Sequence, residues 1–359
     1  MSGSRLPGAV ALLALLALLV GGSLAGVGIG TPATAAIRSS STVAGSARQS
    51  ATPTLTEPKV TVAPTTTTTP ASALPGHNRP TIVVGDMNTP EQFILGALYN
   101  VALSRSGYTV VVTRNIGASY IAQQALRQGT LDIYPDYLDS DLLPSWDRTV
   151  ARLKRNLPSV SAAYAAGRSY ASKHGFKLLA PTPGSDDLGL AVTSQFAREN
   201  HVTSMAQLAA VPLLTFGMPL GFDGLWRAEQ AYDFKAGSVQ YGATGDQYRG
   251  LATGSVQVTY ADSTDPQLEA PGYVLLADPK HVYGFGNVVP VTTPRVVRAE
   301  GPAFMRIIDR VDALVTTRAL RGLNAEVQLM GHDPVAVAEQ FLQGNRLLPP
   351  NNYQVVPSG

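Results

Sequence analysis

The sequence predicts an α/β fold of two lobes, with parallel-rich sheets and a ligand cleft between the lobes. Three observations support this. Short apolar runs alternate with helical patterns, one such unit recurs 125 residues later, and both copies end in polar or aromatic residues. Alternating strands and helices favour parallel strands joined by crossover helices. Ligands of open α/β sheets bind outside the carboxyl ends of the strands, so these ends are where a site is expected.

The first elements follow directly from the residues after Pro80. Residues 81–85 (TIVVG) form a short apolar run closed by glycine, which is typical of a strand buried on both faces. Thr89, Pro90 and Glu91 supply an N-cap, a first-turn proline and an early acid, so a helix is predicted from there to about residue 106.

The same pattern continues along the chain. It predicts further strands at 108–113, 213–217 and 238–241, and helices at about 223–232, 302–315 and 333–342.

The repeat is an ungapped match at an offset of 125 residues. The triplet 117–119 (GAS) recurs as 242–244 (GAT), 129–131 (GTL) recurs as 254–256 (GSV), and Tyr137 falls opposite Asp262. Two lobes of equivalent build are therefore predicted, with Tyr137 and Asp262 on the two walls of the cleft. Chance likeness of two strand–helix units is the alternative. Ser119 and Thr244 are expected to be helix caps.

Charge and composition exclude several classes of function. The chain has 27 Lys and Arg and 25 Asp and Glu, but from Pro80 onward 22 basic and 24 acidic residues remain, a net charge of −2. A nucleic-acid binder would need a basic surface, so no nucleic-acid partner is expected. The absence of cysteine excludes disulfides, thiolate zinc sites and a lipid-anchor cysteine, and no metal site is expected from five His.

Catalytic motifs are missing as well. The chain contains no phosphate loop, no HExxH and no GxSxG, so we expect no enzyme, no catalytic residue and no cofactor.

The first 79 residues have the composition of an export leader and a tether. Arg5 precedes the apolar run 9–20, and small residues follow at 33–35, which is typical of a secretory signal within 1–36. Since 9–29 lacks charge over a length close to the roughly 20 residues that span a bilayer, an uncleaved anchor is the alternative, with membrane association through this helix. Residues 37–79 are rich in Ser, Thr and Pro and predict a disordered tether.

Three segments together resemble a known family. They are 85–99 (GDMNTPEQFILGALY), 125–137 (ALRQGTLDIYPDY) and 323–342 (LNAEVQLMGHDPVAVAEQFL), in order and at family spacing. They are similar to motifs of the substrate-binding proteins of glycine betaine, carnitine and choline ABC importers, the osmoprotectant-uptake family, over about 81–348. The resemblance implies a type II periplasmic-binding-protein fold that closes on a small-molecule solute and delivers it to an ABC permease with its ATPase.

The family's ligand site is only partly matched. Its aromatic box, which attracts a trimethylammonium group by cation–π interaction, is represented by Tyr137. Leu188, Asp262 and Gly286 stand at the other three box positions, although Phe285 is near enough to substitute for the last ring.

The family's cationic positions are changed too. A lysine is replaced by Met87 and an arginine by Gly221, while Ser140 matches a hydroxyl position and Asp139 replaces a glycine beside it. The candidate ligand-binding residues are Tyr137, Asp139, Ser140, Asp262, Asp86, Gln92, Asp186 and Phe285.

The charge of this site predicts the class of solute. Asp86, Asp139 and Asp262 would repel a ligand carboxylate, and burying a carboxylate unpaired costs several kcal/mol. We therefore expect a solute without a carboxylate, either a choline-like amine or a neutral polar solute. Two alternatives remain: Asp86 and Asp139 as turn or cap residues, and a tethered sensory or adhesive receptor that uses the same fold.

The predicted boundaries complete the interpretation. Lobe 1 is expected over 80–183 and 286–349, lobe 2 over 184–285, and a C-terminal tail over 350–359.

Overall fold

The computed structural model describes residues 74–138, 157–222, 224–243, 245–269 and 271–348. The predicted leader, most of the predicted tether, Asp139, Ser140, Thr244 and the predicted tail lie outside these ranges. Within them, no helix combines the length and the apolar character needed to cross a membrane.

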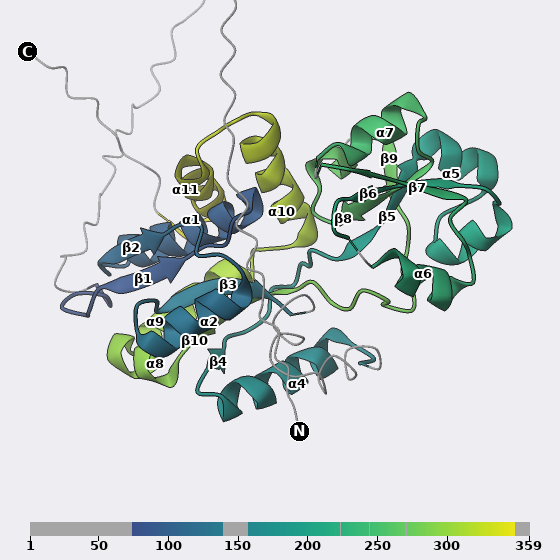
Figure 1. Cartoon of the computed structure of the whole chain (residues 1–359). Coiled ribbons are helices and arrows are strands. Elements are labelled where there is room, and N and C mark those ends of the chain that lie inside the picture. The colour runs from purple at the N-terminus through teal and green to yellow at the C-terminus, as the bar shows by residue number, and fades with distance from the viewer. Residues whose placement is uncertain (1–73, 139–156, 223, 244, 270, 349–359) are drawn as a thin grey trace, which may run out of the picture. The chain divides into compact units, whose positions relative to one another are not determined.

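The first sheet has five strands in the order β2-β1-β3-β10-β4 (Figure 1). Strand β1 pairs in parallel with β2 and β3, and β10 runs antiparallel to both β3 and β4, so the sheet is mixed. The strands are β1 (Ile82–Gly85), β2 (Val110–Thr113), β3 (Ile133–Tyr137), β4 (Lys177–Leu178) and β10 (Val288–Thr292).

The helices that pack with this sheet come from two parts of the chain, one before and one after the second sheet in sequence. They are α1 (Pro90–Arg105), α2 (Ser119–Gln128), α4 (Val160–Lys173), α8 (Pro294–Glu300), α9 (Pro302–Asp312), α10 (Thr317–Asn324) and α11 (Pro334–Gly344). Helix α1 packs against α9, α10 and α11, which belong to the returning C-terminal segment. It is therefore buried along most of its length. A π-helical turn over Ala325–Leu329 continues α10.

The second sheet repeats this plan with five strands in the order β7-β6-β8-β5-β9. Its strands are β5 (Leu188–Thr193), β6 (Thr215–Pro219), β7 (Ser238–Gly242), β8 (Val258–Asp262) and β9 (Tyr273–Leu275). Its helices are α5 (Ser194–Asn200), α6 (Leu225–Tyr232), α7 (Gln247–Thr253) and 3-10 turns at Met205–Ala210 and Pro266–Glu269.

The two sheets place the repeated units in equivalent positions. Helix α2 ends at Gly129 (φ 76°) and α7 ends at Gly254 (φ 74°), a left-handed conformation that glycine adopts without steric cost. The strands that follow, β3 and β8, begin and end 125 residues apart. Strand β3 pairs in parallel with β1, through Ile133 and Val84, and β8 pairs in parallel with β6, through Val258 and Phe216.

Most predicted elements occur in the structure, with small shifts at their ends. Helix α1 begins after Thr89, whose hydroxyl accepts a hydrogen bond from the Gln92 amide, as the capping pattern predicts. Strand β6 begins at Thr215 and not at the predicted Leu213, because Leu213 adopts a positive φ of 60° and is 86% exposed. Helix α9 ends three residues before the predicted 315.

Two segments carry the chain between the sheets, one after β4 and one before β10. Asn287, which is buried, holds them together by donating from Nδ2 to the carbonyls of Thr182 (2.9 Å) and Gly184 (3.1 Å). An isolated antiparallel bridge joins Ser185 and Asn287. The predicted lobe boundaries at 183/184 and 285/286 fall within these segments and stay a prediction.

Candidate functional site

A chain of hydrogen bonds joins the first sheet to the second. Its members lie in α1, at the ends of β3 and α10, just after β8 and just before β5. The Tyr137 hydroxyl at the end of β3 donates to Glu91 Oε1 (2.8 Å), and Asn324 Nδ2 at the end of α10 donates to Glu91 Oε2 (2.7 Å). The same Asn324 Nδ2 donates to the Thr264 carbonyl (3.1 Å), and the Thr264 hydroxyl donates to Asp186 Oδ1 (2.6 Å). We call Glu91, Tyr137, Asn324, Thr264 and Asp186 the Glu91 network.

More carboxylates lie at the end of β8. Asp262 Oδ2 accepts from the Tyr260 hydroxyl (2.7 Å), and the Asp262 amide donates to Asp265 Oδ2 (3.0 Å). Asp265 Oδ2 also accepts from the Tyr248 hydroxyl (2.8 Å). The end of β8 is therefore a group of tyrosines and carboxylates, as is the end of β3.

Electrostatic coupling connects these groups. Burial raises the pKa of Tyr137 well above its usual range, and the charges of Glu91 and Asp186 raise it further. Burial also raises the pKa of Tyr260, with added contributions from Asp262, Asp186 and Asp265. The charge of Asp186 thus acts both on Tyr137, the last residue of β3, and on Tyr260, in the middle of β8.

Glu91 is the most enclosed carboxyl group of this set, at 5% exposure. Burial raises its pKa, while the hydrogen bonds from Asn324 and Tyr137 oppose the rise and the charge of Asp265 adds to it. Two side-chain donors, Tyr137 and Asn324, thus serve the two oxygens of this carboxyl group, and such donors favour its ionised form.

The aromatic side chains near β8 form a second group. The Phe222 ring meets the Tyr260 ring edge to face at 5.3 Å and lies 6.4 Å from the Tyr283 ring. Phe222 directly follows Gly221, the position where the family pattern has a cationic residue. Ring faces attract organic cations, so these rings are suited to a cationic solute.

Asp86 lies at the end of β1 and is 1% exposed. Its Oδ1 accepts from the Asn115 amide (3.0 Å), and its side chain packs against Gly96 of α1 so closely that a Cβ there would lie 3.1 Å from it. Burial raises the Asp86 pKa to about 6, with the Asn115 amide and Arg114 acting in the opposite direction. These contacts agree with the alternative that Asp86 is a turn residue.

Gln92 is fully buried, which sequence alone did not indicate, since amides on helix surfaces are usually solvated. Its Oε1 accepts from the Met87 amide (3.4 Å), and its side chain is among the polar groups that act on the Tyr137 pKa, which it lowers. Among the described residues, its Nε2 has no hydrogen-bond partner. Gln92 thus lies near Tyr137.

Phe285 and Gly286 lie at one of the positions where the family pattern has an aromatic ring. Phe285 is 7% exposed and packs in the apolar cluster that contains Tyr134 and Leu178. A Cβ on Gly286 would lie 1.9 Å from the Asp186 carbonyl oxygen, so this backbone leaves no space for an aromatic side chain at position 286. The structure does not describe Asp139 or Ser140, the two candidates that follow Leu138.

One expectation about capping is wrong. The N-cap of α2 is Ala118, not Ser119, and the Ser119 hydroxyl donates instead to the buried Asp136 (3.0 Å). Asp136 also accepts from the Tyr134 hydroxyl (2.7 Å) and the Tyr137 amide (2.8 Å). Ser119 therefore supports the carboxylate next to Tyr137, and does not cap the helix.

Sequence reasoning missed several members of the site. Glu91 was expected only as a first-turn acid, while Thr264 and Asn324 gave no indication because their partners lie far away in sequence. Arg321 was also missed. Its Nη2 donates to the Ser263 carbonyl at 2.7 Å, and its Nη1 lies 3.9 Å from Glu269. Within the described ranges, no group of three His, Asp or Glu side chains has the arrangement of a metal site.

Comparison with known proteins identifies the family. The family model described as the substrate binding domain of ABC-type glycine betaine transport systems matches residues 80–344. The glycine betaine-binding protein YehZ of Escherichia coli strain K12 is 27% identical over 289 residues, covering 76% of this chain and 93% of the relative. A glycine-betaine-binding protein of Pseudomonas aeruginosa strain PAO1 is 27% identical over 284 residues, covering 75% of this chain and 89% of the relative.

Solved structures agree with this assignment. The apo structure of YehZ from E. coli has a TM-score of 0.63 and 26% identity, covering 74% of this chain and 99% of that one. A structure titled glycine betaine/carnitine/choline ABC transporter has a TM-score of 0.65 at 22% identity, covering 74% of this chain and 99% of that one, and shows the shared fold. The chain belongs to the family of substrate-binding domains of glycine betaine-type ABC transporters. It has their two-lobed α/β fold of the type II periplasmic-binding-protein class, and it is a binding protein, not an enzyme.

Proposed function

We propose that this chain is the extracytoplasmic solute-binding component of an ABC importer, and that its solute is a cation without a carboxylate, of the choline type. The observation that carries the ligand class is the balance of charge around Tyr137 and Tyr260. Glu91, Asp186 and Asp262 contact these tyrosines or act on them electrostatically. A quaternary ammonium group between such rings and carboxylates would gain cation–π and Coulomb attraction together.

Arg321 offsets part of this negative charge, since it opposes the rise in the Asp265 pKa, but its nitrogens are bonded elsewhere. Arg321 Nε and Nη2 both donate to the Ser263 carbonyl, at 3.2 and 2.7 Å. Its guanidinium is thus committed to the backbone, while Met87 and Gly221 stand where the family pattern has cations. A ligand carboxylate would face the acidic side chains without a dedicated partner, at a cost of several kcal/mol. Glycine betaine should therefore bind poorly, unlike what the names of the two relatives indicate for those proteins.

Delivery to a permease is part of this proposal, and membership of the family supports it. The proposed lobes are 80–183 with 286–349, and 184–285, connected by the two segments that Asn287 holds together. Closure on the solute would favour docking on the permease, because only an interaction that differs between open and closed states can shift their equilibrium. The leader within 1–36 would export the protein, either cleaved or kept as an anchor.

Calorimetry with three matched solutes tests the ligand class. Choline, its uncharged isostere 3,3-dimethylbutan-1-ol and glycine betaine separate the effects of charge, shape and carboxylate. We expect choline to bind at least about tenfold more tightly than the isostere, which corresponds to about 1.4 kcal/mol, and more tightly than glycine betaine. Micromolar affinity for glycine betaine would contradict the proposal. Binding of neutral polyols without choline would leave the receptor function intact but overturn the cationic ligand.

A further inference from the structure

The Glu91 network joins two proposed ligand-binding residues through groups that were not among the predicted site residues. Glu91 lies in the first turn of α1, Tyr137 ends β3, and Asn324 ends α10, directly before the π-helical turn. The Glu91–Asn324 hydrogen bond spans 233 residues of sequence. These contacts form only when β3 and α10 are folded against the first turn of α1.

The network continues to the second sheet without a break. Asn324 donates to the carbonyl of Thr264, two residues beyond β8, and the hydroxyl of Thr264 donates to Asp186, two residues before β5. Asn324 and Thr264 are each 2% exposed, so water competes little for these bonds. Tyr137 and Asp186 are therefore linked through three buried intermediates.

We propose that Glu91 is a positioning residue for the solute site, which fixes the Tyr137 hydroxyl and, through Asn324 and Thr264, the Asp186 carboxylate. This inference rests on the proposed function in that Tyr137 and Asp186 are taken to face the solute. Groups held in their binding orientation before the ligand arrives lose less entropy on binding, so affinity rises. Glu91 acts through its neighbours and needs no contact with the solute.

The hydrogen-bonding capacity of Asn324 makes this arrangement specific for a carboxylate at position 91. The Nδ2 group has two hydrogens and serves two acceptors, Glu91 Oε2 and the Thr264 carbonyl. Glutamine at position 91 could accept from Tyr137 only by presenting its own NH₂ group to Asn324, which places two donors together. Rotating the Asn324 amide would satisfy that glutamine but would turn Asn324 Oδ1 toward the Thr264 carbonyl. In the opposite orientation the glutamine would accept from Asn324 and donate to the Tyr137 hydroxyl oxygen, so the Tyr137 proton would lose its acceptor. Each orientation therefore changes at least one hydrogen bond of the network, although glutamine matches glutamate in volume.

A double-mutant cycle measured with choline tests the coupling. Tyr137→Phe keeps the ring and removes the hydroxyl, and we expect it to weaken choline binding about fivefold in the wild-type background. Glu91→Gln should weaken binding about tenfold, and Tyr137→Phe should then add less than about twofold. Glu326→Gln is the matched control, because Glu326 is exposed and pairs with His332 at 2.7 Å outside the network; it should change affinity less than about twofold. Wild-type affinity in Glu91→Gln, or additive effects in the double variant, would overturn the proposal.

A second measurement does not depend on the ligand. With tyrosines labelled at the ring carbon that carries the hydroxyl, the Tyr137 resonance can be assigned from its loss in Tyr137→Phe. It should shift in Glu91→Gln and stay in place in Glu326→Gln. If choline does not bind the wild type but the resonance shifts, the proposed ligand is wrong and the positioning role of Glu91 stands. An unmoved resonance would refute that role whatever the ligand. If Glu91→Gln does not fold, Asn324→Ala breaks the link to Thr264 and should likewise lower choline affinity, and its wild-type affinity would also refute the proposal.

Discussion

The unit around β3 and the unit around β8 share their backbone design but differ in the side chains that end it. In the first, the Val83 amide donates to Asp132 Oδ2 (2.9 Å), and in the second the Thr215 amide donates to Gln257 Oε1 (3.0 Å). Asp132 and Gln257 are 125 residues apart, and each also donates its own amide to the carbonyl of the same partner at 2.9 Å. The two hydrogen bonds that orient the start of β3 are thus repeated at the start of β8.

The strand ends differ instead. Tyr137 ends β3 where Asp262 ends β8. The buried Asp86, directly after β1, corresponds to the buried Met218 within β6, since Val84 and Phe216 hold the same register. In the proposed site, a tyrosine at one strand end and a carboxylate at the other would suit a ligand with two unlike sides. The two units thus keep the same local hydrogen bonds in their backbone design and differ in the side chains at the strand ends.

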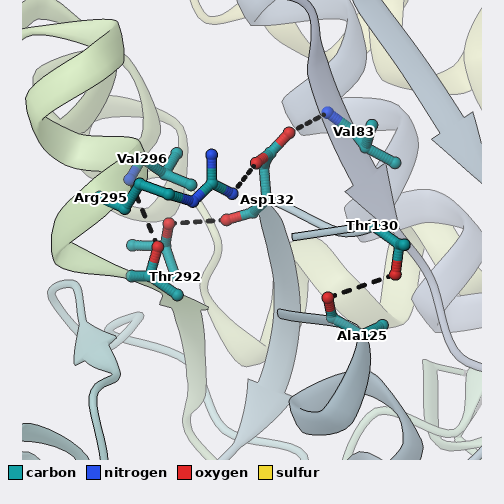
Figure 2. Close-up of polar contacts among 8 residues, drawn as sticks. Val83, Ala125, Thr130, Asp132, Thr292, Arg295 and Val296 are labelled. Carbon is teal, nitrogen blue, oxygen red and sulfur yellow. Dashed lines mark hydrogen bonds and ion pairs between the residues drawn. The ribbon is translucent and has the colours of Figure 1, made fainter. Parts of the chain in front are cut away.

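The largest effect is expected from removing the side chain that orients β3. Figure 2 shows Asp132 between Val83 and Arg295, whose Nη2 donates to Asp132 Oδ1 at 2.9 Å. Asp132→Ala leaves the Val83 amide and the Arg295 guanidinium without this acceptor, so the free energy of unfolding should fall by about 3 kcal/mol. Gln257→Ala removes a neutral acceptor in the second unit and should cost about 1 kcal/mol. Urea unfolding measures both, and equal losses would show that the ion pair to Arg295 contributes nothing.

A smaller effect, with a defined pH dependence, is expected at Asp86. Its pKa is raised from 3.8 to about 6, so the folded protein holds this proton more tightly than the unfolded chain does. The associated stability is fully present below about pH 4 and is lost as the pH rises through about 6. Asp86→Asn cannot ionise, so its stability relative to the wild type should rise by about 2 kcal/mol between about pH 4 and pH 8.

The second unit supplies the control for that experiment. Met218→Leu is a volume-conserving change at the corresponding buried position and should keep the wild-type pH profile. Urea unfolding at about pH 4, 6 and 8 compares the three proteins. Parallel profiles for Asp86→Asn and the wild type would mean that burial does not perturb this carboxyl group.

The contrast between Tyr137 and Asp262 can be tested in binding. Tyr137→Ala removes a ring face and should weaken choline by about tenfold, or about 1.4 kcal/mol, and its uncharged isostere somewhat less. Asp262→Asn removes only charge and should weaken choline by about fivefold while leaving the isostere unchanged. Calorimetry with both solutes gives the two ratios. Asp262→Asn affecting both solutes equally would indicate a structural role through Tyr260.

These residues also show how far the sequence could be used. The offset of 125 residues identified Tyr137 and Asp262 as equivalent strand ends, because glycine C-caps and short strands leave a local pattern. Asn324 and Thr264 left none, since their contacts with Glu91 and Asp186 depend on packing between distant segments. The burial of Gln92 left no local pattern either: α9, α10 and α11 cover α1, and nothing in the sequence of α1 reveals a helix buried on several sides. Strand and helix type follow from local chemistry, and burial follows from the partners that the fold brings.

The smallest effect tests whether the equivalence extends to the helix ends. The Thr130 hydroxyl donates to the Ala125 carbonyl at 3.3 Å, and the Ser255 hydroxyl donates to the Gly250 carbonyl at 3.2 Å, which are the same positions in the two units. Both side chains are exposed, so water replaces most of what each bond contributes. Thr130→Ala and Ser255→Ala should each lower the free energy of unfolding by about 0.5 kcal/mol, and by the same amount within error. Since Ser255 also accepts from Thr253 at 3.2 Å, a clearly larger loss for Ser255→Ala would show that the second unit depends on a contact that the first lacks.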